Sequence, residues 1–588
     1  MAERTPRWRR CAVLLAVALA VLTPAGCGAV PDSGVAGPGR ELVEAAPEPL
    51  RVAALGPRPG AGPDEIVQGF LRAGGSTDDD QMVARSFLVG SAVRSWQPAR
   101  GVVVYADDSS LTTTVRGTTS PVRVDVTTPV LATIDEQGRF AQARQGTTAH
   151  AVFTAVRTGG QWRVSVVDGA FGSWLPQFAL DRTYSALPVS FVAAGTTTLV
   201  PDLRWLPGRR PSLATALVRQ LLLGPPAHLG TAVVTGFPRG TTLAVDAVPT
   251  TGGVAQVDLS AQALTATPAM RQMLWAQLTA TLRRLPSVAE VQLTVAGAPF
   301  RVPGVTNASV YGDTGFRDDV RVTGDPVALS ANKLVEIDAV SGRLDARRAT
   351  DLSPGVRLRS LAVGARGSLV VGVESTGRRL VRTQTGGRPT VLLTGSDLVD
   401  PVIDATGAVW SADLAQPGRL RVVVGTAVRD VAPRATTLAP DWLVGRVVRA
   451  VDVARDGARV LVVSQGPDGD RRVDVAGVRR GTGGQPLGLA ATPLEVARSL
   501  RRVVDAAWAD RTQLVVLARG AGDTATRPYD VVVGGPATAL AAAPNAVAVA
   551  AGDGIREVYL TTDRGTVLAR SGTGWATVGV GRSVSVPE

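Results

Sequence analysis

The sequence is poor in the side chains that most enzymes use for chemistry. Its 588 residues include two cysteines (Cys11 and Cys27), two histidines (His150 and His228) and a single lysine, Lys333. A structural zinc site needs about four Cys or His ligands at defined spacing, and a GxxxxGK[ST] phosphate loop needs a lysine after a glycine-rich turn. Lys333 lies in Ser-Ala-Asn-Lys-Leu, so neither site is predicted. Ser-His-Asp or Cys-His catalysis would have to depend on one of the two histidines.

Aromatic side chains and clustered charge are also scarce. Aromatic residues make up 4% of the chain, and the formal net charge of +12 is carried almost entirely by arginines scattered along it. A nucleic-acid-binding protein is expected to gather basic residues on one face, with aromatic side chains among them. We therefore predict no nucleic-acid partner. A hydrophobic fraction of 45% with 19% charged residues is typical of folded domains, and the length allows three or four of them.

The clearest motif lies at the N-terminus. Four arginines among the first ten residues precede an apolar run over residues 11–23. This run is short for a membrane span, which needs about 20 residues, and is typical of a secretory signal. Ala25-Gly26-Cys27 then resembles the lipobox of bacterial lipoproteins, although Pro24 stands where that motif usually has leucine. We predict a signal peptide over residues 1–26 and lipid attachment at Cys27, with an ordinary secretory signal or an uncleaved anchor as the alternatives.

A tether and a first folded domain are expected next. Residues 27–62 are rich in Pro, Gly, Ala and Glu without periodicity, which predicts a flexible tether. In residues 63–175, one helix is predicted to begin at Pro63 and a second to run from Met82 to about Pro98. Alternating strands follow, and His150 is expected to be a strand residue rather than a catalytic one. This order predicts an α+β domain of the nuclear-transport-factor-like or cystatin-like kind.

The pattern of residues 186–305 predicts a second α+β domain. Strands are interleaved with two helices, one from about Pro211 to Gly224-Pro225-Pro226 and one from about Pro268 to Leu285. Residues 212–226 resemble the helix of a GerMN (sporulation and spore-germination) domain, and residues 254–260 resemble a strand of that domain.

Residues 312–588 have an all-β pattern. A Val-rich phrase followed by a Gly or Asp turn recurs with starts about 41 to 53 residues apart, beginning at Leu361, Val402, Val451, Val504 and Val547. This spacing is typical of four-stranded propeller blades. With a further unit near residues 326–344, five or six blades are predicted, and residues 582–586 are expected to close the ring by pairing with the first blade. A pair of β-sandwiches is the alternative.

No segment assembles a nucleophile, a base and an orienting group. Asp404 to Trp410 is similar to a sialidase Asp-box but has one residue too many, which favours a turn with the tryptophan packed between blades. Asp107-Asp108 and Asp78-Asp79-Asp80 are interpreted as solvated turns, and Gly466–Asp470 is too short for an EF-hand calcium loop. His228 is the better candidate for a surface function, and Trp205 either stacks on a ligand or packs under a loop. We predict no catalytic, metal or cofactor site.

Taken together, the lipobox, the segment Asp64–Ala73, the GerMN-like phrases and the repeats resemble the LpqB family of actinobacterial lipoproteins over nearly the full length. The resemblance implies a non-enzymatic accessory protein, lipid-anchored on the extracytoplasmic face of the cell membrane. It also implies a partner, the extracytoplasmic domain of an MtrB-like sensor histidine kinase in an MtrAB-type two-component system that affects the envelope and division. The alternative is a peptidoglycan-binding cell-wall lipoprotein and, less favoured, a glycan hydrolase.

Overall fold

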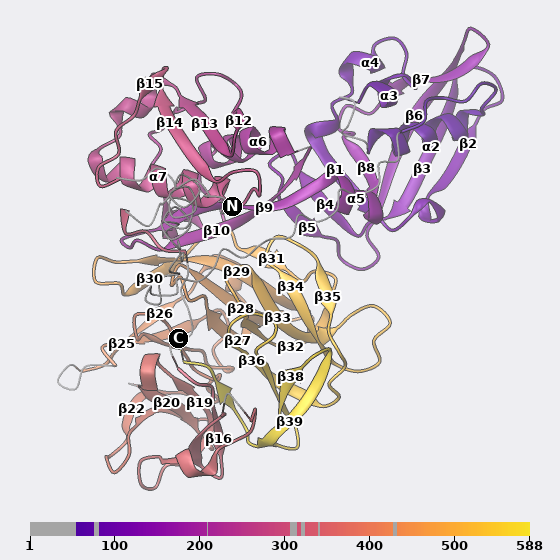
Figure 1. The fold of residues 1–588 in the computed structure, drawn as a ribbon. Coiled ribbons are helices and arrows are strands. Elements are labelled where there is room, and N and C mark those ends of the chain that lie inside the picture. Colours follow the sequence, from indigo (N-terminus) through magenta and orange to yellow (C-terminus); the bar gives the residue numbers. More distant parts are fainter. Residues whose placement is uncertain are drawn as a thin grey trace, which may run out of the picture. The chain divides into compact units, whose positions relative to one another are not determined.

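The computed structural model describes residues 54–75, 81–208, 210–305, 314–318, 324–338, 341–367, 369–426 and 432–587 (Figure 1). All of them belong to one compact unit. The predicted signal peptide, Cys27 and most of the predicted tether lie outside the described residues. Within the described residues, no helix is both long enough and apolar enough to cross a bilayer.

The first domain begins with the predicted helix, α2 (Pro63–Gly74). Its start has a chemical cause, because Pro63 occupies the first turn and the Glu65 carboxylate accepts a hydrogen bond from the Gly62 N–H at 3.0 Å. The prediction of one continuous second helix from Met82 to about Pro98 is wrong. It is divided into α3 (Met82–Arg85) and α4 (Ala92–Ser95), because the intervening chain pairs with a strand: the Val89 N–H donates to the Val164 carbonyl at 2.9 Å.

Two four-stranded sheets complete this α+β domain. The first has the order β2-β3-β6-β7 and is antiparallel, with β2 (Thr112–Arg116), β3 (Val122–Pro129), β6 (Thr148–Thr158) and β7 (Gln161–Val167). The second has the order β5-β4-β1-β8, with β1 (Gly101–Tyr105), β4 (Ala132–Asp135), β5 (Phe140–Gln142) and β8 (Ser173–Pro176). The apolar face of α2 joins the buried core that includes residues of β3, β6 and β7.

The second domain combines two small sheets with two helices. One sheet has the order β10-β9-β11, with β9 (Tyr184–Ala193), β10 (Leu199–Pro207) and β11 (Val233–Val234). The other has the order β12-β13-β14-β15, with β12 (Thr250–Thr251), β13 (Val254–Leu259), β14 (Glu290–Val295) and β15 (Ala298–Pro299). The helices are α6 (Arg210–Leu222) and α7 (Pro268–Leu282), close to their predicted ranges, and the short α5 (Gln177–Thr183) precedes β9. β13 and β14 are parallel and are joined by the segment that contains α7.

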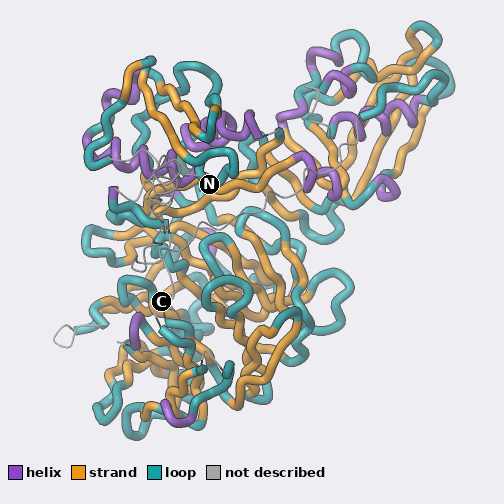
Figure 2. The backbone as a smooth tube through the Cα atoms, viewed as in Figure 1, coloured by secondary structure: helices purple, strands orange, loops and turns teal. Residues whose placement is uncertain are grey.

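From residue 327 onward the described chain is almost entirely strand and loop, whereas helices cover sheets in the first two domains (Figure 2). The strands form six sheets, which we call blades 1 to 6. Blade 1 contains β16 (Val327–Ser330), β17 (Lys333–Glu336), β18 (Thr350–Asp351) and β40 (Val584–Ser585); blade 2 contains β19 (Leu358–Val363), β20 (Val370–Glu374), β21 (Arg379–Thr383) and β22 (Thr390–Thr394); blade 3 contains β23 (Val402–Ile403), β24 (Val409–Ser411), β25 (Leu420–Val424) and β26 (Arg434–Leu438). Blade 4 contains β27 (Val447–Val453), β28 (Arg459–Gln465), β29 (Arg471–Arg480), β30 (Pro486–Leu489) and β31 (Leu494–Val496); blade 5 contains β32 (Arg501–Trp508), β33 (Gln513–Arg519), β34 (Arg527–Val532) and β35 (Ala537–Ala539); blade 6 contains β36 (Ala546–Ala551), β37 (Val558–Thr562), β38 (Thr566–Ser571) and β39 (Gly574–Val580).

The predicted ring closure is confirmed. β40, the last strand of the chain, pairs antiparallel with β16 in the register Val327↔Ser585, so blade 1 contains both ends of the domain. In blades 2 to 6 the first strand in the sequence is an edge strand of its sheet (β19, β23, β27, β32 and β36), and in blade 1 the last strand of the chain, β40, takes this place. These six strands are called the inner strands below, because residues of all six line one cavity.

Candidate functional site

The Asp-box-like segment is a packed corner, as predicted. One carboxylate oxygen of Asp404 accepts hydrogen bonds from the Trp410 indole at 2.9 Å and from the Arg480 guanidinium at 2.7 Å. The other accepts from the backbone N–H groups of Thr406 and Ala408. Trp410 is fully buried. Both carboxylate oxygens therefore hold the turn together.

Trp205 also has a packing role. It is 8% exposed, it stacks on the Phe140 ring with centroids 5.1 Å apart, and its indole N–H donates to the Gly534 carbonyl at 2.9 Å. Of the two interpretations left open by the sequence, the structure confirms packing. Its face is not available to a sugar or a peptide.

The structure does not support a surface function for His228, which was the better candidate for one but not the favoured interpretation. Its side chain is 11% exposed, and its Nε2 lies 3.7 Å from Asp202 Oδ1. Burial, reinforced by the nearby arginines 459, 204 and 139, lowers the pKa of His228 to about 3. The physical reason is the path of the chain after Gly224-Pro225-Pro226, because the His228 carbonyl accepts a hydrogen bond from the Gly477 N–H of β29 at 2.7 Å.

The remaining acidic candidates behave as solvated turns or ion pairs. Asp107 accepts from the Ser109 N–H at 2.9 Å, and hydrogen bonds from Ser109 hold the pKa of Asp107 below its usual value. Asp108 pairs with Arg72 at 2.7 Å. His150 lies in β6, half-exposed, with its Nε2 3.2 Å from Asp125 Oδ1. Asp78, Asp79 and Asp80 lie outside the described residues, within which no cluster of His, Cys, Asp or Glu is arranged to hold a metal.

Aromatic side chains fill the interior of the first domain. Nuclear-transport-factor-like folds, the kind predicted for this domain, often have a pocket there. Phe70 packs edge-on to Trp96 with ring centroids 4.9 Å apart, and Phe153 packs edge-on to Phe171 at 5.2 Å. Trp174 extends the same cluster, and all five rings are buried. These rings supply hydrophobic core rather than a ligand surface.

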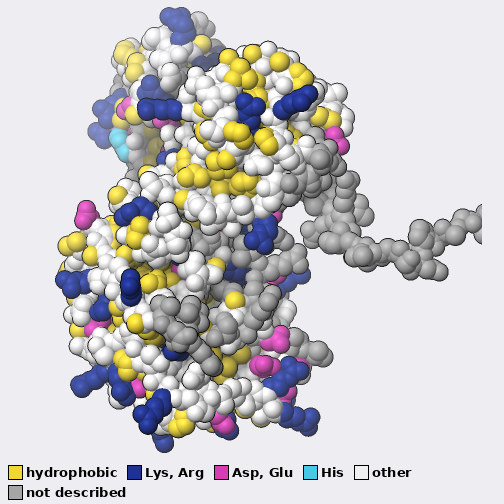
Figure 3. Space-filling view, turned by 90° about the vertical axis from the view of Figure 1, so that its left-hand side faces the viewer, with side chains coloured by type: hydrophobic (Ala, Val, Ile, Leu, Met, Phe, Trp, Pro, Cys, Tyr) yellow, Lys and Arg dark blue, Asp and Glu magenta, His cyan; other side chains and the backbone are white. Residues whose placement is uncertain are grey.

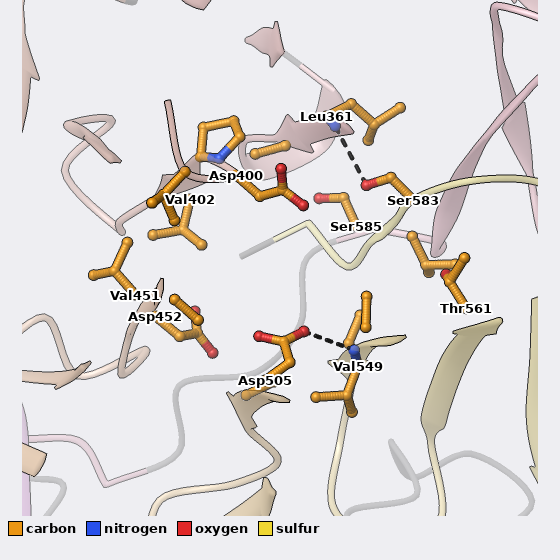
Figure 4. Close-up of a pocket in the computed structure, with 18 of the residues that line it drawn as sticks. Leu361, Asp400, Val402, Val451, Asp452, Asp505, Val549, Thr561, Ser583 and Ser585 are labelled. Atoms are coloured by element: carbon orange, nitrogen blue, oxygen red, sulfur yellow. Dashed lines mark hydrogen bonds between the residues drawn. The ribbon is translucent and has the colours of Figure 1, made fainter. Parts of the chain in front are cut away.

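A cavity of about 310 Å³ lies among the inner strands of the six blades. Most of the residues that line it are small and apolar, but arginine and hydroxyl side chains also reach it, as do three carboxyl groups: Asp400 just before β23, Asp452 on β27 and Asp505 on β32. Figure 4 shows the carboxyl groups of Asp400 and Asp505 on either side of the open space, with the Ser585 hydroxyl beside Asp400. Pockets that bind small molecules also place a few convergent polar groups among apolar residues, and their volumes start at about 300 Å³.

The polar side chains of the inner strands join neighbouring blades. Asp505 Oδ2 accepts from the Val549 N–H at 2.8 Å, which links blade 5 to blade 6 (Figure 4). Asp452 Oδ2 accepts from the Trp508 N–H at 2.7 Å and links blade 4 to blade 5. Ser585 does the same from blade 1 to blade 2, accepting from the Val363 N–H at 3.0 Å. Because every inner strand is a sheet edge, these contacts satisfy N–H groups that no neighbouring strand reaches.

Burial raises the pKa of all three carboxyl groups in the cavity. Desolvation raises the pKa of Asp505 to about 7, opposed by its backbone hydrogen bonds and reinforced by the negative charges of Asp400 and Asp452. The same burial raises the pKa of Asp452 to about 6 and raises that of Asp400 against the attraction of Arg359. Groups with strongly shifted pKa values in a cavity are typical of functional sites, although structural networks share the feature.

Sequence reasoning missed these three aspartates. A signal was present, since Asp452 and Asp505 each stand at the centre of a Val-rich repeat phrase where a buried strand would have an apolar residue. The repeats do not show that these aspartates lie close together, because their proximity depends on closure of the ring of blades.

Comparison with known proteins agrees with this architecture domain by domain. Residues 56–178 match the family model "Lipoprotein LpqB, N-terminal domain", residues 188–301 match "Sporulation and spore germination", and residues 345–588 match "Lipoprotein LpqB beta-propeller domain". Lipoprotein LpqB of Streptomyces coelicolor is 30% identical over 591 residues, which cover 94% of this chain and 93% of the relative. The chain belongs to the LpqB lipoprotein family.

Two further relatives extend the match to other actinobacteria. Lipoprotein LpqB of Thermobifida fusca is 29% identical over 563 residues, covering 87% of each chain, and that of Mycobacterium tuberculosis is 27% identical over 585 residues, covering 90% of this chain and 92% of the relative. The predicted fold class, with a GerMN-like domain before a C-terminal propeller, is confirmed. Membership in a lipoprotein family indicates attachment to a membrane, and the LpqB relatives are named as lipoproteins rather than enzymes. Lipid attachment at Cys27 stays a prediction.

Proposed function

We propose that this LpqB-family chain is a non-enzymatic accessory lipoprotein that binds the extracytoplasmic domain of an MtrB-like sensor histidine kinase and modulates its signalling. The proposal places the three domains on the extracytoplasmic face, held there by a lipid on Cys27. The observation that carries it is the nearly full-length match to a lipoprotein family by a chain built of broad, packed modules.

The chemistry of the described residues favours binding over catalysis. Both carboxylate oxygens of Asp404, Asp452 and Asp505 accept hydrogen bonds from the protein itself. His228 has a pKa lowered to about 3 by burial, so it remains a neutral imidazole with little basicity near pH 7. A general base needs a pKa near the working pH and a free approach to substrate. The described residues therefore favour a protein that binds a partner through its surface over one that reacts with a substrate.

Modulation would follow from differential binding. A partner that binds one conformation of a kinase more tightly than another shifts the kinase toward the bound conformation. Attachment to the same membrane adds to this effect, because it raises the effective concentration of the two proteins for each other. On the face shown in Figure 3 the arginines form small separate groups, so recognition by shape and mixed polarity is favoured over binding to a single basic surface.

Crosslinking in the native membrane tests the proposal. The full-length chain and the Cys27→Ala variant are expressed at equal levels, and captured proteins are identified. We expect the kinase to be captured by the wild type and captured less by Cys27→Ala, which lacks the anchor. Capture of wall fragments without the kinase would contradict the proposal.

A second arm addresses the wall-binding alternative. Incubation of the full-length chain with purified cell wall at low and high salt measures charge-driven retention, which salt screens. We expect little retention at either salt concentration. Strong retention that is lost at high salt, or released muropeptides, would favour the cell-wall reading instead.

A further inference from the structure

We propose that the cavity among the inner strands is a binding site for a zwitterionic peptide of three residues, whose ammonium group faces Asp505 and Asp452 and whose carboxylate faces Arg359 and Arg449. This inference does not depend on the kinase partner, since the cavity lies within the propeller domain.

Four of the six inner strands have an irregular register with the strand beside them. In blade 2 the register with β20 shifts between Leu358 and Ser360, so Arg359 is the extra residue of a β-bulge. In blade 4 the register with β28 shifts between Val448 and Ala450, so Arg449 is the extra residue. Bulges redirect a side chain at a sheet edge and are over-represented beside functional sites.

The same irregularity recurs in two more blades. The register of β36 shifts around Val547, and that of β32 shifts between Arg501 and Asp505. Arg359, Arg449 and Val547 all line the cavity. Three inner strands therefore have a single extra residue, and in each of them that residue lies on the cavity wall.

The two bulge arginines are held by neighbouring side chains. Asp397 pairs with the Arg359 guanidinium at 2.9 Å, and the Leu398 carbonyl accepts from the same guanidinium. The Gln465 side-chain oxygen accepts from Arg449 Nε at 3.0 Å and from Nη2 at 2.8 Å. A guanidinium has five N–H donors, so each arginine keeps donors for a ligand carboxylate while its position is fixed.

The spacing of two cavity residues along one strand indicates the length of the ligand. Arg449 stands three residues before Asp452 on β27, which corresponds to about 10 Å between their Cα atoms in a regular strand. An extended peptide spans about 3.3–3.6 Å per residue, so a tripeptide matches this spacing and a dipeptide is shorter. Arg582 also lines the cavity and is exposed, which adds positive charge to the lining.

The carboxyl groups suit an ammonium group for an electrostatic reason. Asp400 and Asp452 both add negative potential at Asp505, so three acidic groups act on one another in a poorly solvated space. Each oxygen of Asp505 already accepts one backbone N–H, from Ala506 and from Val549, and a carboxylate oxygen accepts a second donor. An ammonium group supplies both the donors and the opposing charge.

Calorimetric titration of the purified full-length protein in detergent tests the inference, with tri-L-alanine as the probe. Two derivatives of the probe each remove one charge: the N-acetyl tripeptide lacks the ammonium, and the tripeptide amide lacks the carboxylate. We expect saturable binding of the parent tripeptide at up to millimolar concentration and at least about tenfold weaker binding of each derivative. No saturable binding of the parent, or equal binding of the derivatives, overturns the proposal.

Matched variants connect each end of the peptide to its residue. Asp505→Asn should lose the preference for the free amine over its N-acetyl form, and Arg449→Gln should lose the preference for the free acid over its amide. Arg501→Gln, an exposed arginine outside the cavity lining, should keep both preferences. Asp452→Asn, at the other carboxyl group that the proposal places against the ammonium group, replaces Asp505→Asn if that variant does not fold. Variants that retain the full wild-type preferences overturn the proposal.

Discussion

Asp505 on β32 accepts a hydrogen bond from the Val549 N–H on β36 at 2.8 Å, so a side chain of one blade completes the backbone of the next. Asp452 makes the equivalent contact with Trp508 at 2.7 Å. The ring is therefore held by two kinds of bond: the strand pairing of β40 with β16, which closes it, and these side-chain contacts between inner strands. The second kind places charged groups beside a cavity, where they affect both stability and ligand binding.

Removing the carboxyl group should show what the contact contributes. In Asp505→Ala the partly buried Val549 N–H loses its partner, which should cost less than the ~1–3 kcal/mol of a fully buried unsatisfied donor. Asp505→Asn retains an acceptor oxygen and should cost less. Hydrogen exchange at Val549, with thermal unfolding alongside, measures the effect, and Asp563→Ala, at an exposed turn residue, is the control. Equal protection of Val549 in the wild type and in Asp505→Ala would contradict this role.

The raised pKa of Asp505 predicts a pH dependence of defined sign. Because burial raises the pKa from 3.8 to about 7, the folded state binds a proton that the unfolded state has released over this interval. The contribution of Asp505 to stability is therefore fully present below about pH 4 and is lost as the pH rises toward 7. The asparagine of Asp505→Asn does not titrate, so its free energy of unfolding lacks this pH dependence. As the pH rises from 4 toward 7, the variant should therefore gain stability relative to the wild type, with a slope of at most about 1.4 kcal/mol per pH unit. Chemical unfolding from pH 4 to pH 8 measures the difference, and a difference independent of pH would refute the assignment.

The sequence was informative where local chemistry determines structure. Pro63 with Glu65 predicted the start of α2, and the spacing of Val-rich phrases predicted the blades and their closure. The prediction is wrong where a contact distant in the sequence determines the structure. At Val89 a helix was predicted to continue, but the Val89 N–H bonds to the Val164 carbonyl instead. The same limit hid the cavity. Asp404 and Asp452 stand in similar repeat phrases, yet Asp404 binds Trp410 and Arg480 in a packed corner, whereas Asp452 lines the cavity and bonds to the next blade.

A buried ion pair in the second domain predicts a large loss of stability when one of its two partners is replaced. Asp202 and Arg204 form an ion pair, and burial raises the pKa of Asp202 and lowers that of Arg204 in spite of their attraction. Asp202→Asn leaves the arginine charge buried without its partner and should destabilise the protein by about 3–5 kcal/mol. The double variant Asp202→Leu, Arg204→Met should cost less than this single change, because neither charge then remains.

Thermal unfolding compares these variants with a matched surface pair. Asp246, which is exposed and pairs with Arg219, provides the control Asp246→Asn, for which we expect no measurable change. Equal effects of Asp202→Asn and Asp246→Asn would show that burial does not determine the cost.

The second domain and β29 approach each other closely at Gly477, whose N–H donates to the His228 carbonyl at 2.7 Å. A Cβ atom at this position would lie 2.2 Å from the Leu229 carbonyl oxygen and 2.8 Å from the Ala232 side chain, so Gly477→Ala forces the two segments apart. The Gly477 N–H would then lose its bond to the His228 carbonyl, and overpacking of this kind costs about 1–3 kcal/mol. We expect limited proteolysis to cut the segment around residues 228–232 faster in Gly477→Ala. Gly169→Ala is the control, since nothing lies within 4 Å of its added Cβ. Gly477 does not need a left-handed backbone, so an increase in cleavage reports the lost contact rather than backbone strain. A wild-type cleavage pattern in Gly477→Ala would mean that the two segments separate freely.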